Sequence, residues 1–377
     1  MGKKRYFDYS LLTIVIFLMC FGLIMLYSAS SYEAQKDNLG SMYYLIRQGI
    51  FGVLGFAVML VVAKMDYHRL TKLALPAYIA AFIAMALVIT PLGKTVNGAR
   101  RWLRMPFGMT IQPSELMKIA IILLMSFLLC KAGKLVLDKK VVGKIFLWTA
   151  AAAGGVYFLT DNLSTAIIVL GIGFVMIFVA HPKTLPFLAI VAAGIAVIAL
   201  FVFILDSQLD ESTSFRLQRI LVWLHPEENL QDGGFQVMQG LYAIGSGGFF
   251  GKGLGNSAQK IMIPEAQNDM VLAVICEELG VFGALVLFTL FGILLHRLKY
   301  IVENAPDKCG SLIVSGVFAH IALQVILNVV VVLNIIPTTG ITLPFVSYGG
   351  TSLVFLLAEI GLVFSVSNRI EFDEQEI

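Results

Sequence analysis

Residues 264–280 read PEAQNDMVLAVICEELG, a polar segment that runs directly into an apolar stretch of membrane length. Three acids, Asp269, Glu277 and Glu278, stand at the edge of that stretch or inside it. A carboxylate within the hydrocarbon of a membrane is costly, so acids found there mainly serve a function. The segment therefore predicts a membrane helix that begins at a functional site.

The composition of the whole chain is that of a membrane protein. Of its 377 residues 58% are hydrophobic and only 14% are charged, which excludes a soluble globular domain. We therefore expect an all-α polytopic protein that forms one integral membrane domain over residues 1–377, with no nucleic-acid partner. At about 20 apolar residues per span, ten transmembrane helices are predicted, at residues 11–29, 48–63, 73–92, 113–130, 143–160, 164–180, 185–205, 269–295, 311–333 and 346–367.

The distribution of lysine and arginine orients these spans. Basic residues are more numerous in the segments that share a side with the N-terminus, so both termini are predicted to be cytoplasmic. The large loop between the seventh and eighth helices, residues 206–268, is then extracellular and too long for a passive connector. Within it, residues 215–224 carry Arg216 and Arg219 beside apolar residues, a pattern typical of an interfacial amphipathic helix.

The second half of this loop is rich in glycine, from Gly233 to Gly255. Glycine turns that expose backbone N–H groups can hold a phosphate, and Lys252 and Lys260 would add positive charge. A flexible re-entrant loop is the alternative, and the sequence does not separate the two.

A cluster of basic residues lies in the loop from Leu92 to Gln112. It contains Arg100, Arg101 and Arg104 on the side that is predicted to be outside. Interface anchoring would explain such residues. Three arginines within five positions on the disfavoured side instead favour a site for an anionic headgroup, since guanidinium groups bind phosphate oxygens bidentately.

Two further segments carry polar residues into the predicted spans. Glu115 and Lys118 lie on one face of the fourth span at i, i+3 and form either a structural ion pair or the lining of the cavity that the arginines enter. The broken segment PTTGITLPFVSYGGTS, residues 337–352, offers hydroxyl groups such as that of Ser347 and is typical of a cavity lining.

The sequence predicts neither a metal site nor a disulfide. His320 has no second histidine or acid at a metal spacing. The four cysteines fall in spans or on the cytoplasmic side and show no CxxC pattern; they are Cys20, Cys130, Cys276 and Cys309.

Helical geometry separates the acids of the opening stretch. If the helix begins at Asp269, Glu277 lies roughly 12 Å deeper along its axis. Asp269 is then accessible from outside, as a catalytic acid or as a helix N-cap, although Asn268 could cap as well. Glu277 and Glu278 are interpreted as structural, or as groups that tune a polar interior.

Five long motifs, which follow one another along nearly the whole chain, make it resemble the SEDS family (shape, elongation, division and sporulation) of membrane glycosyltransferases. The wording GLGNSAQK is more similar to the division and sporulation types than to the elongation type. The motifs that carry the resemblance are NGARRW at 97–102, QPSELMK at 112–118, GSGGFFGKGLGNSAQK at 245–260, the opening stretch at 264–280 and PTTGITLPFVSYGGTS at 337–352.

The resemblance implies ten transmembrane helices, a large extracellular loop between helices 7 and 8, and polymerisation of lipid II into glycan strands. It matches the essential aspartate of the family to Asp269, and its characteristic Arg, Glu and Lys to Arg101, Glu115 and Lys118. Two departures stand out, Gln267 where relatives commonly have His and Asn162 where many have an acid.

We therefore expect an inverting peptidoglycan glycosyltransferase with Asp269 as general base. Arg100, Arg101, Arg104, Glu115, Lys118, Lys252, Lys260 and Ser347 are its candidate substrate- and pyrophosphate-binding residues. A lipid-linked precursor flippase and an interaction scaffold built on the terminal tails are the alternatives. No cofactor is certain, and a divalent cation, Mg²⁺ or Mn²⁺, is a candidate. The expected partners are a class B penicillin-binding transpeptidase and other division or sporulation proteins of the bacterial inner membrane.

Overall fold

The computed structural model describes residues 4–5, 7–36, 38–96, 99–106, 109–206 and 215–372. Asn97 and Gly98 of the NGARRW motif, residues 207–214 of the long loop, and most of both terminal tails lie outside these residues. Each predicted span overlaps a helix, although several bounds differ by five residues or more. These helices are α1 (Tyr9–Lys36), α2 (Tyr43–Lys64), α4 (Ala74–Leu87), α5 (Pro113–Ala132), α6 (Lys139–Thr160), α7 (Leu163–Ala180), α8 (Leu185–Asp206), α11 (Val271–Glu303), α12 (Lys308–Val332) and α13 (Thr351–Ser367).

The remaining elements are short. They are the helices α3 (Tyr67–Lys72), α9 (Phe215–Leu224) and α10 (Gly234–Gly247), the 3₁₀ turns η2 (Gly133–Leu137), η3 (Leu230–Asp232) and η4 (Gln259–Ile261), and the strands β1 (Lys4–Arg5), β2 (Gly93–Val96), β3 (Ala99–Arg104), β4 (Thr110–Ile111) and β5 (Glu371–Phe372).

Seven helices within the described residues are long and apolar enough to cross a membrane, namely α1, α2, α5 together with η2, α6, α7, α11 and α12. Helices α4 and α13 and the described apolar part of α8 are shorter. The length criterion is thus met by seven of the ten predicted spans. The chain is a polytopic helical membrane protein, the fold in which every backbone group can be satisfied within each span.

Short polar side chains fix where several helices begin. Asp66, Asp138 and Asp307 accept hydrogen bonds from backbone N–H groups in the first turns of α3, α6 and α12, those of His68, Lys140 and Gly310. Each bond satisfies one of the N–H groups that a helix leaves unpaired at its first turn. Pro113 suits the first position of α5 because it lacks an N–H to lose.

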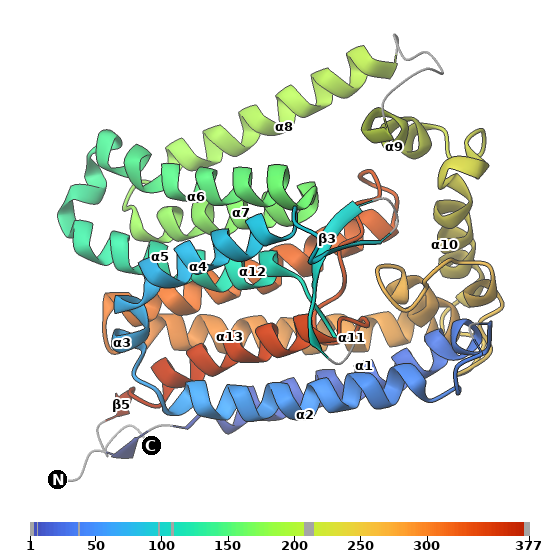
Figure 1. Ribbon diagram of the computed structural model, residues 1–377, viewed down its shortest axis with the longest axis horizontal. Helices are drawn as coiled ribbons and strands as arrows, with labels where there is room; N and C mark the ends of the chain where they lie inside the picture. Colours follow the sequence, from blue (N-terminus) through green and yellow to red (C-terminus); the bar gives the residue numbers. More distant parts are fainter. Residues whose placement is uncertain are drawn as a thin grey trace.

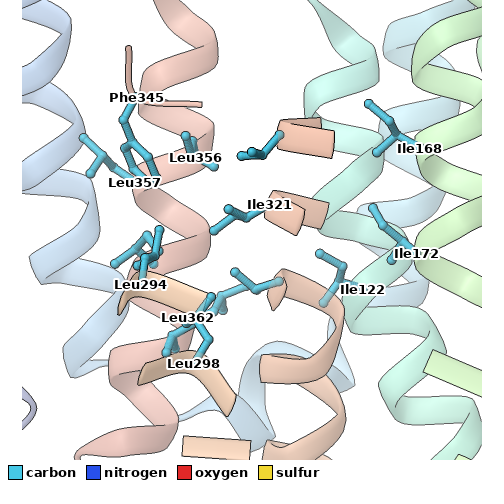
Figure 2. Close-up of a cluster of buried hydrophobic side chains, with 14 of the residues drawn as sticks. Ile122, Ile168, Ile172, Leu294, Leu298, Ile321, Phe345, Leu356, Leu357 and Leu362 are labelled. Atoms are coloured by element: carbon cyan, nitrogen blue, oxygen red, sulfur yellow. The ribbon is translucent and has the colours of Figure 1, made fainter. Parts of the chain in front are cut away.

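The core is built around α12. Ile321 of this helix lies between Leu356 of α13 on one side and the isoleucines of α5 and α7 on the other, Ile122 and Ile168 (Figure 2). All four side chains are almost fully buried. In a lipid environment such contacts stabilise through close packing rather than through exclusion of water. Helix α8 diverges from α7 and leaves the bundle (Figure 1), and most of the apolar side chains described for it, within residues 185–197, are exposed to the surroundings.

The arginine-rich loop is a small antiparallel sheet in the order β2–β3–β4, which the sequence did not predict. Gly93 pairs with Leu103 and Thr95 with Arg100, with an irregularity after Lys94. Arg100 pairs with Thr95 and Trp102 with Lys94, so Arg101 is the extra residue of β3 in a β-bulge. The bulge interrupts the regular alternation of faces within the cluster of three arginines.

Helix α11 is interrupted at Gly280, whose backbone is left-handed (φ 67°, ψ −165°). The carbonyl groups of the preceding turn and the N–H groups of the next one bond instead to residues 248–253. These bonds, donor first, are Lys252 to Glu277 and Gly253 to Glu278, each 2.9 Å, and Val281 to Gly248 and Phe282 to Phe249, each 3.0 Å. The backbones approach so closely that a Cβ on Gly280 would lie 2.4 Å from the Gly251 nitrogen.

The long loop is structured in its described part. Helix α9 has the bounds that were predicted for the amphipathic segment. The first half of the glycine-rich segment is a helix, α10, whereas the sequence had suggested a flexible or phosphate-binding loop. Small residues allow this helix to pack directly on α11, since a Cβ on Gly247 would lie 1.9 Å from the Cys276 carbonyl oxygen.

Candidate functional site

Asp269 lies immediately before α11 and is held by α12 and by the unwound segment between α12 and α13, residues 333–350. The Asn328 amide donates to the Asp269 carbonyl (2.9 Å) and to the Ile341 carbonyl (2.7 Å). The Asp269 carboxylate also approaches Gly340, which has a positive φ of 70°. An added Cβ there would lie 3.9 Å from Asp269 Oδ2. The segment and α12 thus hold Asp269 at the start of α11, while its side chain keeps partial exposure.

The surroundings of Asp269 favour its protonated form more than water does. Burial raises the pKa of Asp269 to about 6, and the nearby Glu265 carboxylate adds to this increase. The backbone N–H groups of Asp269 and Met270 and the Arg219 guanidinium act in the opposite direction, without cancelling it. A carboxyl group with a pKa near neutrality suits proton transfer at physiological pH.

Arg219 joins the site from α9, and the sequence had placed it only in an interfacial helix. Its Nη1 donates to the Thr338 carbonyl at 3.4 Å. The helix is fixed by Trp223, whose Nε1 donates to the Asn334 carbonyl at 2.9 Å, and by Asn334 Nδ2, which donates back to the Trp223 carbonyl at 3.3 Å. The polar face of α9 therefore packs on residues 334–338, beside Asp269.

Arg101 reaches the same region from β3. Its Nε and Nη2 donate to the Asp161 carbonyl at 3.2 and 2.9 Å. Burial first, and then the neighbouring Arg219, lower the pKa of Arg101. The Asp161 carboxylate acts in the opposite direction without cancelling this decrease. Two neighbouring guanidinium groups form a region of positive charge that suits an anion.

The turn between α6 and α7 supports Arg101. Asp161 presents its carbonyl because it adopts the left-handed conformation (φ 48°), which aspartate tolerates better than most residues. Asn162 caps α7 through a bond from Thr165 N–H (3.1 Å), and Ser164 Oγ donates to the Thr339 carbonyl (2.7 Å). Asn162 thus fills a capping role that the more usual acid would also fill.

Arg100 and Arg104 do not join this group. Arg100 Nη2 donates to the Thr90 carbonyl, and its buried Nε has no hydrogen-bond partner within the described chain. Arg104 is exposed at the end of β3. No contact recorded for the described residues joins either arginine to Asp269, so only Arg101 of the predicted cluster reaches the site.

Glu115 and Lys118 belong to a second, deeper group, which we name the buried polar cluster. Lys118 is 2% exposed and lies 2.9 Å from both Glu115 and the His320 ring, and His320 lies 2.6 Å from Glu359 and 2.7 Å from Gln324. His320 precedes Asn328 by two turns of α12, roughly 12 Å along the axis. The cluster comprises Glu115, Lys118, His320, Gln324 and Glu359.

Ser347 lines a cavity of about 20 Å³ beside this cluster, together with Glu115 and Gln324. Such a space is about that of one water molecule. The Ser347 hydroxyl accepts the Leu343 N–H at 2.8 Å, so it stabilises the turn of the unwound segment. This cavity is water-sized and lies below the level of Asp269, and none of the arginines that were expected to open into it lines it.

Lys252 and Lys260 pair with the two inner acids of α11. Lys252 Nζ lies 2.7 Å from Glu277 and Lys260 Nζ lies 3.0 Å from Glu278. Glu278 also accepts from the Ser28 hydroxyl of α1 at 2.6 Å. These pairs fasten the loop after α10 to the kink of α11, in agreement with the structural interpretation of both acids. The lysine charges expected for pyrophosphate are matched there by carboxylates.

Gln267 stands two residues before Asp269 and is almost fully buried, at 3% exposure. Its carbonyl accepts the Tyr348 N–H at 2.9 Å, which ties the opening stretch to the unwound segment. Its Oε1 has no hydrogen-bond partner among the described residues. An amide cannot relay a proton as an imidazole does, so this position serves packing and hydrogen bonding.

Three comparisons place these features among known proteins. Residues 9–371 match a family model described as cell cycle protein, that of FtsW, RodA and SpoVE. The probable peptidoglycan glycosyltransferase FtsW of Geobacter sp. (strain M18) is 34% identical over 98% of this chain and 99% of its own. Stage V sporulation protein E of Bacillus subtilis (strain 168) is 35% identical over 97% of this chain and 98% of its own. A chain of a peptidoglycan synthase complex that coordinates polymerization and crosslinking superposes with a TM-score of 0.76 and 29% identity. The match covers 96% of this chain and 97% of the other.

Proposed function

We infer, because the chain belongs to the family of cell cycle proteins that contains FtsW, RodA and SpoVE, that it is a peptidoglycan glycosyltransferase. Its substrate is lipid II, a disaccharide on undecaprenyl pyrophosphate, which it polymerises into glycan strands. The comparisons do not favour the flippase alternative, since the relatives that carry an enzymatic name cover nearly the whole chain.

We assign Asp269 as the general base of this reaction, and its position beside Arg219, which in turn lies near Arg101, supports the assignment. The 4-hydroxyl of the acceptor sugar attacks the anomeric carbon of the donor, and its proton passes to the Asp269 carboxylate. The bond to the pyrophosphate oxygen breaks, and its electrons leave with undecaprenyl pyrophosphate. Attack opposite the leaving group inverts the anomeric centre and forms a β-linkage.

Arg101 and Arg219 are proposed to bind the pyrophosphate. Arg219 lies near Asp269, and Arg101 lies near Arg219. The leaving group gains negative charge as its bond to the sugar breaks. Fixed positive charge at that position stabilises the transition state more than the ground state. Lys252 and Lys260 are left out of this site because Glu277 and Glu278 already pair with them.

A divalent cation would find few protein ligands here. No group of three His, Cys, Asp or Glu residues that could hold a metal ion occurs in the part of the chain that the structure describes. Asp269 and Glu265 lie near Arg219, and Asp161 lies near Arg101. Mg²⁺ commonly binds one or two carboxylates together with substrate phosphates, so Glu265 would hold it with the pyrophosphate, Asp269 would remain the base, and the charge of the ion would assist the leaving group.

The decisive experiment measures polymerisation of lipid II by purified Asp269→Asn protein. Loss of a general base lowers the rate by about 10²- to 10⁴-fold, while substrate binding is retained. Glu228→Gln is the matched control, because it removes an exposed carboxylate from the long loop that precedes Asp269. Full polymer formation by Asp269→Asn, at a protein level equal to that of the control, would exclude the assignment.

The membrane arrangement completes the proposal. We propose ten spans in a bacterial inner membrane, with both termini in the cytoplasm and residues 206–268 outside, where Asp269 meets its substrate, because the distribution of basic residues favours this orientation. Because the matched complex couples polymerization to crosslinking, we expect a class B penicillin-binding transpeptidase as partner, along with other division or sporulation membrane proteins.

A further inference from the structure

A cavity of about 480 Å³ lies at the opposite end of the bundle from Asp269, among η2, the end of α7 and the start of α12. These segments lie at the end of the bundle that also carries α3 and β5 (Figure 1). Its basic side chains are those of Lys134, His181 and Lys308, and none of its lining residues is acidic. Such a volume lies within the range of small-molecule sites.

The two lysines carry charge that the protein does not neutralise. Neither Lys134 nor Lys308 forms an ion pair with a carboxylate of the described chain, and both are exposed. Asp307 is next to Lys308, but its carboxylate accepts from the Tyr67 hydroxyl (2.8 Å), the His68 ring (2.7 Å) and the Gly310 N–H (2.7 Å). Its negative charge is therefore already matched.

The helix ends at this cavity do not supply the attraction for an anion. Helix α12 presents its N-terminus, which favours an anion, whereas α5, which ends next to Gly133, and α7 present their C-termini, which disfavour one. The carbonyls of the last α7 turn are partly satisfied, since His181 N–H bonds to Ile177 and Phe178. The preference for a negative ligand thus rests on the lysine side chains.

Apolar side chains adjoin the basic ones. Val136, Leu137 and Val179 line the same cavity, and Leu137 and Val179 are 58% and 45% exposed. A free phosphate would gain nothing from such a wall. An acyl chain would, and basic pockets between membrane helices on the cytoplasmic side are known to bind anionic lipid headgroups.

We propose that this cavity binds an anionic phospholipid. Lys134 and Lys308 hold its phosphate, and the first part of an acyl chain lies along Val136, Leu137 and Val179. The site is separate from the catalytic site and does not depend on the activity assigned to Asp269. It would fix the lipid at the ends of α5, α7 and α12, which meet in the core.

The experiment titrates the purified protein in detergent with phosphatidylglycerol and counts bound lipid by native mass spectrometry. We expect saturable binding of one lipid, weakened about thirtyfold in Lys134→Gln/Lys308→Gln, at about 1 kcal/mol per lysine. Lys139→Gln/Lys140→Gln removes the same charge from exposed lysines outside the cavity and should change the affinity less than about threefold. Lys134→Arg/Lys308→Arg should retain binding.

Three results would overturn the proposal. Equal losses in the two glutamine variants would mean general attraction to the cytoplasmic lysines. Equal binding of phosphatidylcholine would mean nonspecific lipid contact. Displacement by inorganic phosphate at the concentration of the lipid would mean a soluble ligand. The melting temperature of each variant is measured in parallel, and the arginine variant separates loss of charge from loss of fold.

Discussion

Asp269 owes its chemical character to burial and to two neighbours of opposite charge, Glu265 and Arg219. Burial raises the pKa of Asp269 to about 6, Glu265 raises it further and Arg219 lowers it. A general base acts in its ionised form, so its contribution is present above this pKa and lost below it. The neighbours should therefore move the acid limb of the rate profile in opposite directions.

We predict that the rate of lipid II polymerisation falls about tenfold for each pH unit below about pH 6. Glu265→Gln should move this limb to lower pH, because a negative neighbour is removed. Arg219→Gln should move it to higher pH and also lower the rate, because a pyrophosphate ligand is lost. The measurement is the initial rate of each variant across the pH range. If the rate of both variants falls at the same pH as that of the natural protein, this account of Asp269 is wrong.

The sequence singles out Asp269 as a candidate, whereas it does not single out Arg219. Asp269 stands where an apolar span meets a polar segment and matches the essential aspartate of the SEDS family by motif. Arg219 looks like any cation of an amphipathic helix, and its role follows only from the packing of α9 against residues 334–338. The i, i+3 spacing of Arg216 and Arg219 was the available signal, and an interfacial helix explains it equally well.

At the scale of the element, the kink of helix α11 requires glycine at position 280. Its left-handed φ of 67° disfavours any side chain, and an added Cβ would lie 2.4 Å from the Gly251 nitrogen and the Phe249 carbonyl oxygen. We predict that Gly280→Ala destabilises the protein by more than about 2 kcal/mol, as backbone strain and displaced backbone act together. Its melting temperature should fall by several degrees.

Gly292→Ala is the control within the same helix. Gly292 is helical, and nothing lies within 4 Å of an added Cβ. Alanine is about 1 kcal/mol better than glycine in a helix interior, so this variant should be as stable as the natural protein or more so. Equal destabilisation by the two substitutions would show that the close crossing of residues 248–253 and α11 is not what requires glycine.

The kink also shows which parts of the fold were beyond prediction from the sequence. Long apolar runs predicted the positions of the helices, because each span satisfies its own backbone. The kink at Gly280 depends on bonds from residues 248–253, and the β2–β3–β4 sheet on pairing between strands. The same holds for the lysines, since Lys252 and Lys260 look like anion ligands until Glu277 and Glu278 are placed beside them.

At the scale of the whole molecule, a cluster of polar side chains joins three distant parts of the chain at the end of the bundle that carries α3 and β5. His68 of α3 lies 2.9 Å from Asp66 and 2.7 Å from Asp307 at the start of α12, and Arg369 beyond α13 lies 3.8 Å from Asp66. Burial lowers the pKa of His68, but hydrogen bonds to the two carboxylates raise it by more, to a net value above its ordinary 6.5.

A raised histidine pKa means that the folded protein binds this proton more tightly than the unfolded chain does. The stabilisation is complete below about pH 6.5 and is lost as the pH rises through the raised pKa. We predict that the natural protein melts at a higher temperature than His68→Gln at about pH 6, and that the difference shrinks at about pH 8.5. His296→Gln, which removes a histidine without a recorded carboxylate partner in the described chain, should show no such trend. A difference for His68→Gln that grows with pH would mean that His68 joins α3 to α12 as a neutral ring, through hydrogen bonds alone.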